Sequence, residues 1–264
     1  MVYDRNLLWV LQQNHPDRAA IIAVADILDD LGVRRLGVEI DLSSLVLPLI
    51  PGLQPGDHAL CYGPSFIRRL DHSDPQWRIG SLFDPATFLW SQFQSHWAGL
   101  MLSEDGQVVS AQELRACLPQ QTIFIRPNAD SKRFDGGLYA PADLEILLAR
   151  LEPHLSVVWA RPTAVDAEYR IFIVGDEVVA ASQYRDGGKP SITGHVPNPV
   201  IDLALAANAL WQPREAYVLD IARSGDRLGI VEANCITAAR FYAANARAVI
   251  TALCALGSRL TGEP

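Results

Sequence analysis

The chain has 264 residues, of which 49% are hydrophobic and 20% charged, so it can bury a sizeable core and long disordered segments are not expected. The formal net charge is -8, from 22 Lys and Arg against 30 Asp and Glu. This balance argues against a general binder of nucleic acid or of membrane surfaces, whose affinity depends on excess positive charge.

The four cysteines form neither a CxxC pair nor a regular spacing, which argues against a disulfide framework and against a zinc site. We expect them to be buried, reduced thiols: Cys61, Cys117, Cys235 and Cys254. No signal peptide is recognisable, and the most apolar run, residues 44–53, is interrupted by proline. The expectation is a cytoplasmic protein without a membrane segment.

The first third of the chain alternates between strand and helix patterns, which favours a small parallel α/β domain. The pattern predicts strands at 7–11 and 36–42, an amphipathic helix at 19–31 that ends before Gly32, and a strand, Gly-Pro turn and short helix within 58–70. Residues 72–88 are rich in Pro, Asp and Gly, as boundaries often are. The predicted domains are therefore 1–85 and 86–264.

The second part predicts an α+β arrangement with two long hairpins. Its expected elements are helices at 88–102, 141–151, 195–210 and about 242–260, strands at 121–127 and 156–162, and hairpins at 167–185 and at 216–223 with 227–235. A loop at 128–139 separates the first strand from the second helix.

Three oxygen-bearing side chains fall on the last hairpin. Glu232 and Asn234 are two positions apart on one strand and must point to the same face, and Asp220 on the partner strand lies within cross-strand reach. Oxygen donors of this kind suit Mg²⁺, which leaves coordination positions for water and phosphate. The alternative is an ordinary solvated face of a two-sided hairpin.

The order of these features resembles the ATP-grasp superfamily, in which an acidic residue is followed twelve positions later by Glu-x-Asn, as with Asp220, Glu232 and Asn234. The motifs that carry the resemblance lie within 115–250: FIRPNADSKRFDGG, AEYRIFIVGDEVVAASQYR, YVLDIA and VEANCITAARFYAAN. They look like a clade in which an arginine, here Arg126, replaces the first nucleotide-binding lysine. The implied fold is α/β (α+β), with a small N-terminal parallel domain followed by two α+β subdomains that clasp a nucleotide.

The resemblance also implies roles for individual residues. Positive charge for the phosphates would come from Arg126 and Lys132, with close backbone approach at Gly136 and Gly137. The nucleotide-binding residues implied are Arg126, Lys132, Gly136, Gly137, Val158, Trp159, Ala160 and Glu168, the catalytic ones Arg126, Lys132, Arg170 and Arg240, and the metal ligands Asp220, Glu232 and Asn234. Tyr184, Arg185 and Tyr242 would lie near substrate. The plainer alternatives are a surface salt bridge for Arg126, a simple turn for the two glycines, a core position for Trp159 and an internal ion pair for Glu168 and Arg170.

The function implied by the resemblance is an ATP-dependent, ADP-forming carboxylate–amine (or carboxylate–thiol) ligase that uses Mg²⁺, with two ions, and proceeds through an acyl phosphate. Its partners would be small-molecule or peptide carboxylates and amines, and nucleic acid is not expected. An ATP-grasp kinase and a non-catalytic nucleotide-binding module are the alternatives. The sequence specifies neither the substrates nor the oligomeric state.

Overall fold

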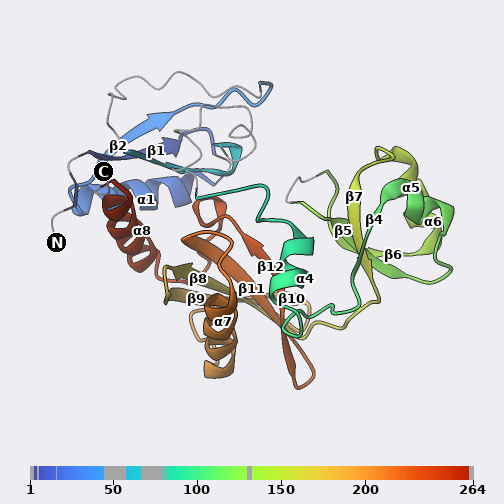
Figure 1. Cartoon of the computed structure of the whole chain (residues 1–264). Helices are drawn as coiled ribbons and strands as arrows, with labels where there is room; N and C mark the ends of the chain where they lie inside the picture. Colours follow the sequence, from blue (N-terminus) through green and yellow to red (C-terminus); the bar gives the residue numbers. More distant parts are fainter. Residues whose placement is uncertain are drawn as a thin grey trace.

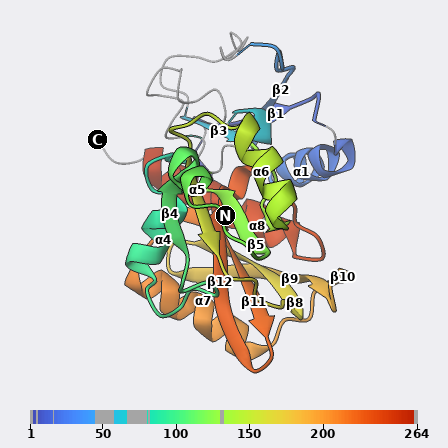
Figure 2. The same cartoon turned by 90° about the vertical axis from the view of Figure 1, so that its right-hand side faces the viewer.

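The computed structural model describes residues 3–4, 6–15, 17–44, 58–66, 80, 82–129 and 133–261. Its strands form three sheets that follow one another across the molecule (Figure 1). The N-terminal sheet lies at one end, a five-stranded sheet lies in the middle, and a four-stranded sheet with its two helices lies at the other end. Seen along the perpendicular direction, that four-stranded unit stands in front of the rest (Figure 2). Within the described residues, no helix combines the length and the apolar character that crossing a bilayer requires.

The N-terminal sheet is parallel, as predicted, with the strand order β2-β1-β3. Its central strand is buried on both faces, because Leu7, Trp9 and Leu11 face one core while Leu8 and Val10 face another. The elements are β1 (Leu7–Gln12), α1 (Arg18–Asp30), β2 (Arg34–Val38) and β3 (His58–Tyr62). A single helical turn at 64–66 follows β3, so the predicted strand, turn and helix are confirmed as far as residue 66.

Helix α1 begins and ends where the sequence signals predict. The side chain of Asp17 accepts a hydrogen bond from the Ala20 N–H (3.1 Å) at its start, and Gly32 takes a left-handed conformation (φ +67°) just beyond its end. Strand β2 is shorter than predicted. The Asn14 side chain bonds both the N–H and the C=O of Ile40 (3.1 and 2.8 Å), which replaces strand pairing there.

The five-stranded sheet is antiparallel with the order β10-β9-β8-β11-β12, and it contains both predicted hairpins. One face packs on α7 and α4, and the other packs on α8. The elements are β8 (Ala167–Val174), β9 (Glu177–Asp186), β10 (Lys189–Thr193), α7 (Asn198–Leu210), β11 (Ala216–Ser224), β12 (Arg227–Asn234), η1 (Ile236–Ala238) and α8 (Ala246–Thr261). Strand β10 was not predicted, since it carries Pro190, and its position at the sheet edge tolerates a missing donor.

The four-stranded sheet, of order β4-β7-β5-β6, packs one face on α5 and α6. Its elements are β4 (Gln107–Ser110), α5 (Ala111–Ala116), β5 (Ile123–Pro127), β6 (Gly137–Tyr139), α6 (Pro141–Arg150) and β7 (Ser156–Ala160). Neither β4 nor α5 was predicted, although the Ser110-x-x-Glu113 capping box that starts α5 is present in the sequence. Strand β5 alternates, so Ile123 and Ile125 face the helices while Phe124 and Arg126 face the opposite side.

The predicted helix at 88–102 is wrong in length: α4 (Trp90–His96) has 7 residues. The chain turns at Gly99 (φ +81°) and then runs beside β12, where Leu102 N–H donates to the Ile230 carbonyl (2.8 Å) and Ile230 N–H donates to the Leu100 carbonyl (2.8 Å). The aromatic side chains of this region are buried: Trp90, Phe93 and Trp97.

Helix α8 also begins later than predicted, because Tyr242 has a left-handed backbone (φ +52°) that a helix cannot include. The side chain of Asn245 accepts from the Ala248 N–H (3.1 Å) at the start of α8. The helix lies between the N-terminal sheet and the five-stranded sheet and shares one core with both (Figure 1). The boundary at 85/86 remains a prediction, and this core includes residues from both sides of it.

The cysteines are all free. Cys61, Cys235 and Cys254 are buried as expected, but Cys117, at the end of α5, is exposed.

Candidate active site

The open face of the four-stranded sheet lies across from the five-stranded sheet, and two adjoining cavities of about 430 and 300 Å³ occupy the space between them. Residues that line both come from each side: Phe124, Arg126, Gly136, Glu168, Arg185 and Val231. The two sheets therefore enclose a cleft large enough for a small ligand.

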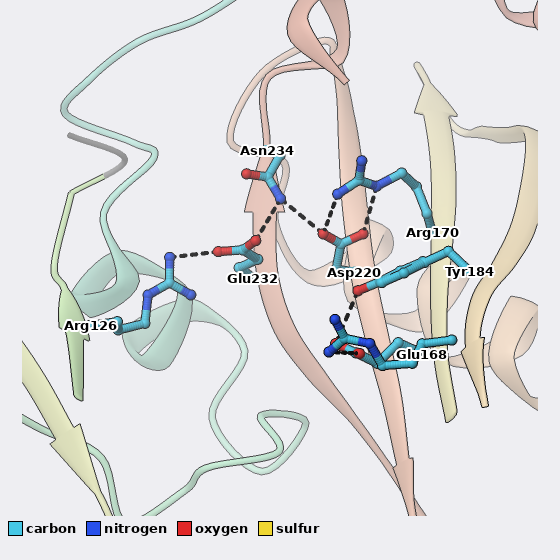
Figure 3. Close-up of polar contacts among 8 residues, drawn as sticks. Arg126, Glu168, Arg170, Tyr184, Asp220, Glu232 and Asn234 are labelled. Carbon is cyan, nitrogen blue, oxygen red and sulfur yellow. Dashed lines mark hydrogen bonds and ion pairs between the residues drawn. The ribbon is translucent and has the colours of Figure 1, made fainter. Parts of the chain in front are cut away.

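Asp220, Glu232 and Asn234 converge beside this cleft on one face of the hairpin, as the hairpin spacing predicts (Figure 3), and of the three Glu232 lines the smaller cavity. Asp220 pairs directly with Glu232 in the register of β11 and β12. The side-chain amide of Asn234 donates to Asp220 Oδ2 (3.0 Å) and to Glu232 Oε1 (2.9 Å). The three side chains share one sheet face and are in contact.

A β-bulge shapes this part of β12. The register passes from Asp220–Glu232 to Ile221–Ile230, so Val231 is the extra residue. As a result, the consecutive residues Val231 and Glu232 both line the smaller cavity, which strict alternation would not permit. The sequence gives no signal for this bulge.

Arg170 on β8 holds Asp220 by two parallel hydrogen bonds, from Nε to Oδ1 (2.9 Å) and from Nη2 to Oδ2 (2.8 Å). Asp220 is only 2% exposed. Burial raises the pKa of Asp220, and the Arg170 guanidinium opposes that effect. Burial disfavours the charged form of Arg170, but the negative charge of Asp220 outweighs it and raises the Arg170 pKa above its usual value.

Arg126 reaches Glu232 from the opposite side of the cleft (Figure 3). Its Nη2 lies 2.5 Å from Glu232 Oε2, and both side chains are largely buried. Positive charge thus flanks the two acidic residues on both sides, with Arg126 next to Glu232 and Arg170 next to Asp220. Such an arrangement suits a ligand that brings further negative charge together with a cation.

Glu168 lies beside the same cleft with two partners on β9. Tyr184 donates from its hydroxyl to Glu168 Oε1 (3.1 Å), and Arg185 Nη1 lies 2.7 Å from Glu168 Oε2. Burial, followed by the charges of Asp220 and Glu168, raises the pKa of Tyr184 above its usual value, so the phenol stays protonated as a donor. Glu168 lines both cavities, as the resemblance implies.

The role of Val158, Trp159 and Ala160 as nucleotide contacts remains a prediction. These residues lie in β7, which pairs with β4 on one side and with β5 on the other, and none of them lines either cavity. The following segment lines the larger cavity instead, at Arg161, Thr163, Ala164 and Val165. The segment that the resemblance implies, 158–161, reaches only Arg161. Sequence reasoning missed Thr163, Ala164 and Val165, because a proline-containing connection between strands carries no recognisable ligand signal.

Gly136 and Gly137 differ in their surroundings, although both line the larger cavity. A Cβ on Gly136 would lie 3.0 Å from the Cβ of Arg126, whereas one on Gly137 would find its nearest neighbour at 3.8 Å. The close approach of the loop to Arg126 therefore favours glycine at Gly136, whereas a Cβ at Gly137 would make only an ordinary contact. Lys132, which the resemblance implies as a second cation, lies outside the described residues.

Arg240, implied as catalytic, is exposed and follows η1, after the strand that carries Asn234. Within the described part of the chain it has no hydrogen bond or ion pair, and it lines neither cavity. Its role remains a prediction.

The donors fit a hard divalent cation. Asp220, Glu232 and Asn234 offer carboxylate and amide oxygens, the ligand types that Mg²⁺ prefers. Among the described residues, no group of three or more His, Cys, Asp or Glu could hold a metal alone. This set would therefore hold Mg²⁺ only together with other oxygens, such as those of water and phosphate.

A cleft between a hairpin sheet that carries acidic side chains and a second sheet with an arginine and a glycine loop is the arrangement expected of an ATP-grasp domain. The chain belongs to this superfamily: residues 56–253 match a family described as an ATP-grasp domain, family 3 of its clade. No curated protein matches the sequence.

Solved structures agree on the fold. The chain resembles the ATP-grasp ligase PsnB complexed with minimal precursor (14% identity, TM-score 0.58, covering 98% of this chain and 100% of that one). It also resembles the D-cycloserine synthetase DcsG (16%, TM-score 0.59, 96% and 99%). A RimK domain protein ATP-grasp from Sphaerobacter thermophilus DSM 20745 has a TM-score of 0.66 at 12% identity, over 94% and 99% of the two chains. At these identities the similarity concerns the fold.

Proposed function

We propose that this protein is an ATP-dependent, ADP-forming ligase that activates a carboxylate by phosphoryl transfer from Mg–ATP and joins it to an amine. The observation that carries the proposal is the convergence of Asp220, Glu232 and Asn234 opposite Arg126. Together these groups provide oxygen ligands for a cation and positive charge for a polyphosphate on the two sides of one cleft.

In this proposal Asp220, Glu232 and Asn234 would hold Mg²⁺, as two ions. When bound, the metal neutralises charge on the phosphate oxygens. Arg126 binds the phosphates from the opposite sheet, where arginine in place of lysine gives a two-pronged donor, and Lys132 is proposed as a second positive charge for them. The larger cavity would take the nucleoside, with Glu168 and the segment 161–165 as its contacts.

In this proposal Arg170 acts on the group that is transferred. Its guanidinium is held by Asp220 and has fixed orientation before substrate arrives. The carboxylate of the first substrate attacks the γ-phosphate to form an acyl phosphate and ADP, and the amine then displaces phosphate. Closure of the cleft by the four-stranded unit excludes water that would hydrolyse the acyl phosphate.

The similar proteins support the substrate classes. The ATP-grasp ligase PsnB is complexed with a minimal precursor in one structure and with the precursor peptide PsnA2 in another. A second similar protein is a D-cycloserine synthetase. A carboxylate and an amine, carried by a small molecule or by a peptide, are therefore the first substrates to test. The dependence on ATP and the free cysteines fit a cytoplasmic location.

The test begins with binding. Mg–ATP should raise the melting temperature of the full chain, and at a nucleotide concentration 100 times Kd the stabilisation is about 2.7 kcal/mol. Unchanged melting would contradict every nucleotide-dependent function. A screen of paired carboxylates and amines then follows ADP and free phosphate, both of which a ligase releases only when the two substrates are present. ADP with a stable phosphorylated product would identify a kinase instead, and binding without turnover in any pair would indicate a nucleotide-binding module.

Glu232→Ala tests the metal assignment. We expect ADP release to fall by about 100-fold or more, because the cation loses a charged ligand, while the far-ultraviolet circular dichroism stays that of the parent. Val108→Ala is a matched control on the exposed side of β4, at 38% exposure and outside both cavities. Retention of full activity in Glu232→Ala would contradict the metal assignment.

A further inference from the structure

The loop between η1 and α8 contains a residue in an unusual backbone conformation next to the candidate site. Tyr242 has φ +52°, in the left-handed region that residues other than glycine seldom adopt, and among the described non-glycine residues only Leu82 shares it. Such conformations persist where the surroundings fix them, and they concentrate at functional sites.

One hydrogen bond holds this loop against β9, and another closes a turn within the loop. The Ala243 N–H donates to the hydroxyl of Ser182 (3.1 Å), and the Ala244 N–H donates to the Phe241 carbonyl (2.9 Å). Ser182 is fully buried, and its hydroxyl in turn donates a hydrogen bond to the Gln183 carbonyl (2.8 Å). Ser182 is also the cross-strand partner of Arg170. The anchor of the loop and Arg170 therefore occupy the same row of the sheet.

Two consecutive aromatic residues of the loop pack against different parts of the molecule. The ring of Phe241 lies 5.6 Å from that of Phe172 and 6.1 Å from that of Tyr62, within the core below α8. The ring of Tyr242 instead stacks on Tyr184, with 5.0 Å between centroids and 11° between planes. Phe241 thus attaches the loop to the core, and Tyr242 attaches it to the site.

The guanidinium of Arg170 packs against this stacked pair. Its Cζ lies 5.2 Å from the ring centroid of Tyr242 and 5.6 Å from that of Tyr184. Distances within about 6 Å over an aromatic face are those of cation–π contacts, which are strongest where water is excluded. Arg170 therefore directs Nε and Nη2 to Asp220 and has its charge next to two rings, of which that of Tyr242 belongs to an exposed residue.

We infer that Tyr242 is a positioning residue, which fixes the guanidinium of Arg170 in its two-bond contact with Asp220. The left-handed backbone is what brings the ring to this place while Phe241 stays in the core. Tyr242, like Arg170, lines neither of the two cavities, and among the described residues its contacts with the site are those with Arg170 and Tyr184. The effect of Tyr242 on turnover rests on the proposed function, because that effect requires Arg170 to contact the transferred group.

The first test needs no substrate. In the ¹⁵N-labelled full chain, the Nε–H signal of Arg170 is assigned by its disappearance in Arg170→Lys, and its hydrogen exchange is measured in Tyr242→Leu, in the conservative variant Tyr242→Phe and in Phe241→Leu. We expect exchange about tenfold faster in Tyr242→Leu, because the cation–π contact is lost. Tyr242→Phe keeps the ring and should keep the slow exchange.

Phe241→Leu is the matched control, because it removes a ring from the same loop on the core side. It should lower the melting temperature without changing the exchange of the Arg170 Nε–H. Wild-type exchange in Tyr242→Leu would overturn the inference. Equal acceleration in Phe241→Leu and Tyr242→Leu would also overturn it, since general loosening of the loop would then explain both.

Turnover gives a second readout. Once a substrate pair is known, Tyr242→Leu should lower kcat by about 100-fold, the effect of a misplaced catalytic group, while the KM for ATP stays within about twofold, as expected where the uniform binding of the nucleotide is untouched. In an Arg170→Lys background, Tyr242→Leu should have no further effect, and additive losses would contradict action through Arg170. If the wild type turns over no substrate pair, the ligase proposal fails, whereas the exchange measurement still decides the role of Tyr242.

Discussion

The two sheets that enclose the cleft contribute to it in different ways. The five-stranded sheet presents three charged groups and one amide from three adjacent strands, held to one another: Arg170, Asp220, Glu232 and Asn234. The four-stranded sheet presents one described arginine, Arg126, beside a glycine loop. The groups on the five-stranded sheet are fixed by strand register and burial before any ligand binds. Arg126 can meet its partner, Glu232, only across the cleft. Electrostatic preorganisation therefore belongs mainly to the five-stranded sheet.

The largest expected effect tests the buried pair on that sheet. Asp220→Ala leaves the guanidinium of Arg170, whose side chain is 14% exposed, without its carboxylate. We expect a loss of about 3–5 kcal/mol in the free energy of unfolding, measured by urea denaturation, because an unpaired buried charge remains. Glu104→Ala is the control, since its 2.6 Å pair with Arg227 is about half exposed. That variant should lose at most about 1 kcal/mol. Equal losses in the two variants would contradict the special position of Asp220.

A smaller loss of stability is expected for a substitution at Gly229, on the edge strand β12 of the five-stranded sheet. A Cβ on Gly229 would lie 2.6 Å from the Cα of Leu102, in the segment that hydrogen-bonds to β12. Gly229→Ala should therefore cost about 1–3 kcal/mol of unfolding free energy, because backbone must move.

Gly137→Ala is the matched strand glycine for that measurement, since its nearest neighbour would be at 3.8 Å, an ordinary contact. Its unfolding free energy should stay the same or rise slightly, because alanine lowers the entropy of the unfolded chain. If Gly229→Ala is as stable as Gly137→Ala, residues 100–102 do not need their close approach to the sheet edge.

The smallest effect concerns the four-stranded sheet. Gly136→Ala should displace Arg126 by a few tenths of an ångström, because the added Cβ would lie 3.0 Å from the Cβ of the arginine. We expect the affinity for Mg–AMPPNP, measured by calorimetry, to fall by about fivefold, which corresponds to about 1 kcal/mol. Gly137→Ala again serves as the comparison and should change the affinity less. A larger loss of affinity in Gly137→Ala than in Gly136→Ala would contradict the assignment of the close contact with Arg126 to Gly136.

Local sequence signals predicted the elements that have strong periodicity or clear ends. The parallel β1–α1–β2 order, both long hairpins and helices α6 and α7 are confirmed. The misses have local causes: α4 stops because the chain turns at Gly99, and α8 starts late because of the backbone of Tyr242. Short elements such as β4 and α5 give too few residues for a period to be recognised.

What the sequence determined by itself is the placement of Asp220, Glu232 and Asn234 on one face, because alternation along paired strands is a local property. Only the tertiary structure decided which groups face them. The pairing of Arg126 with Glu232, the segment 161–165 at the larger cavity and the packing of Tyr242 on Arg170 each join positions on separate elements. Contacts between separate elements depend on how sheets pack and where the chain turns, and no spacing within one segment encodes that.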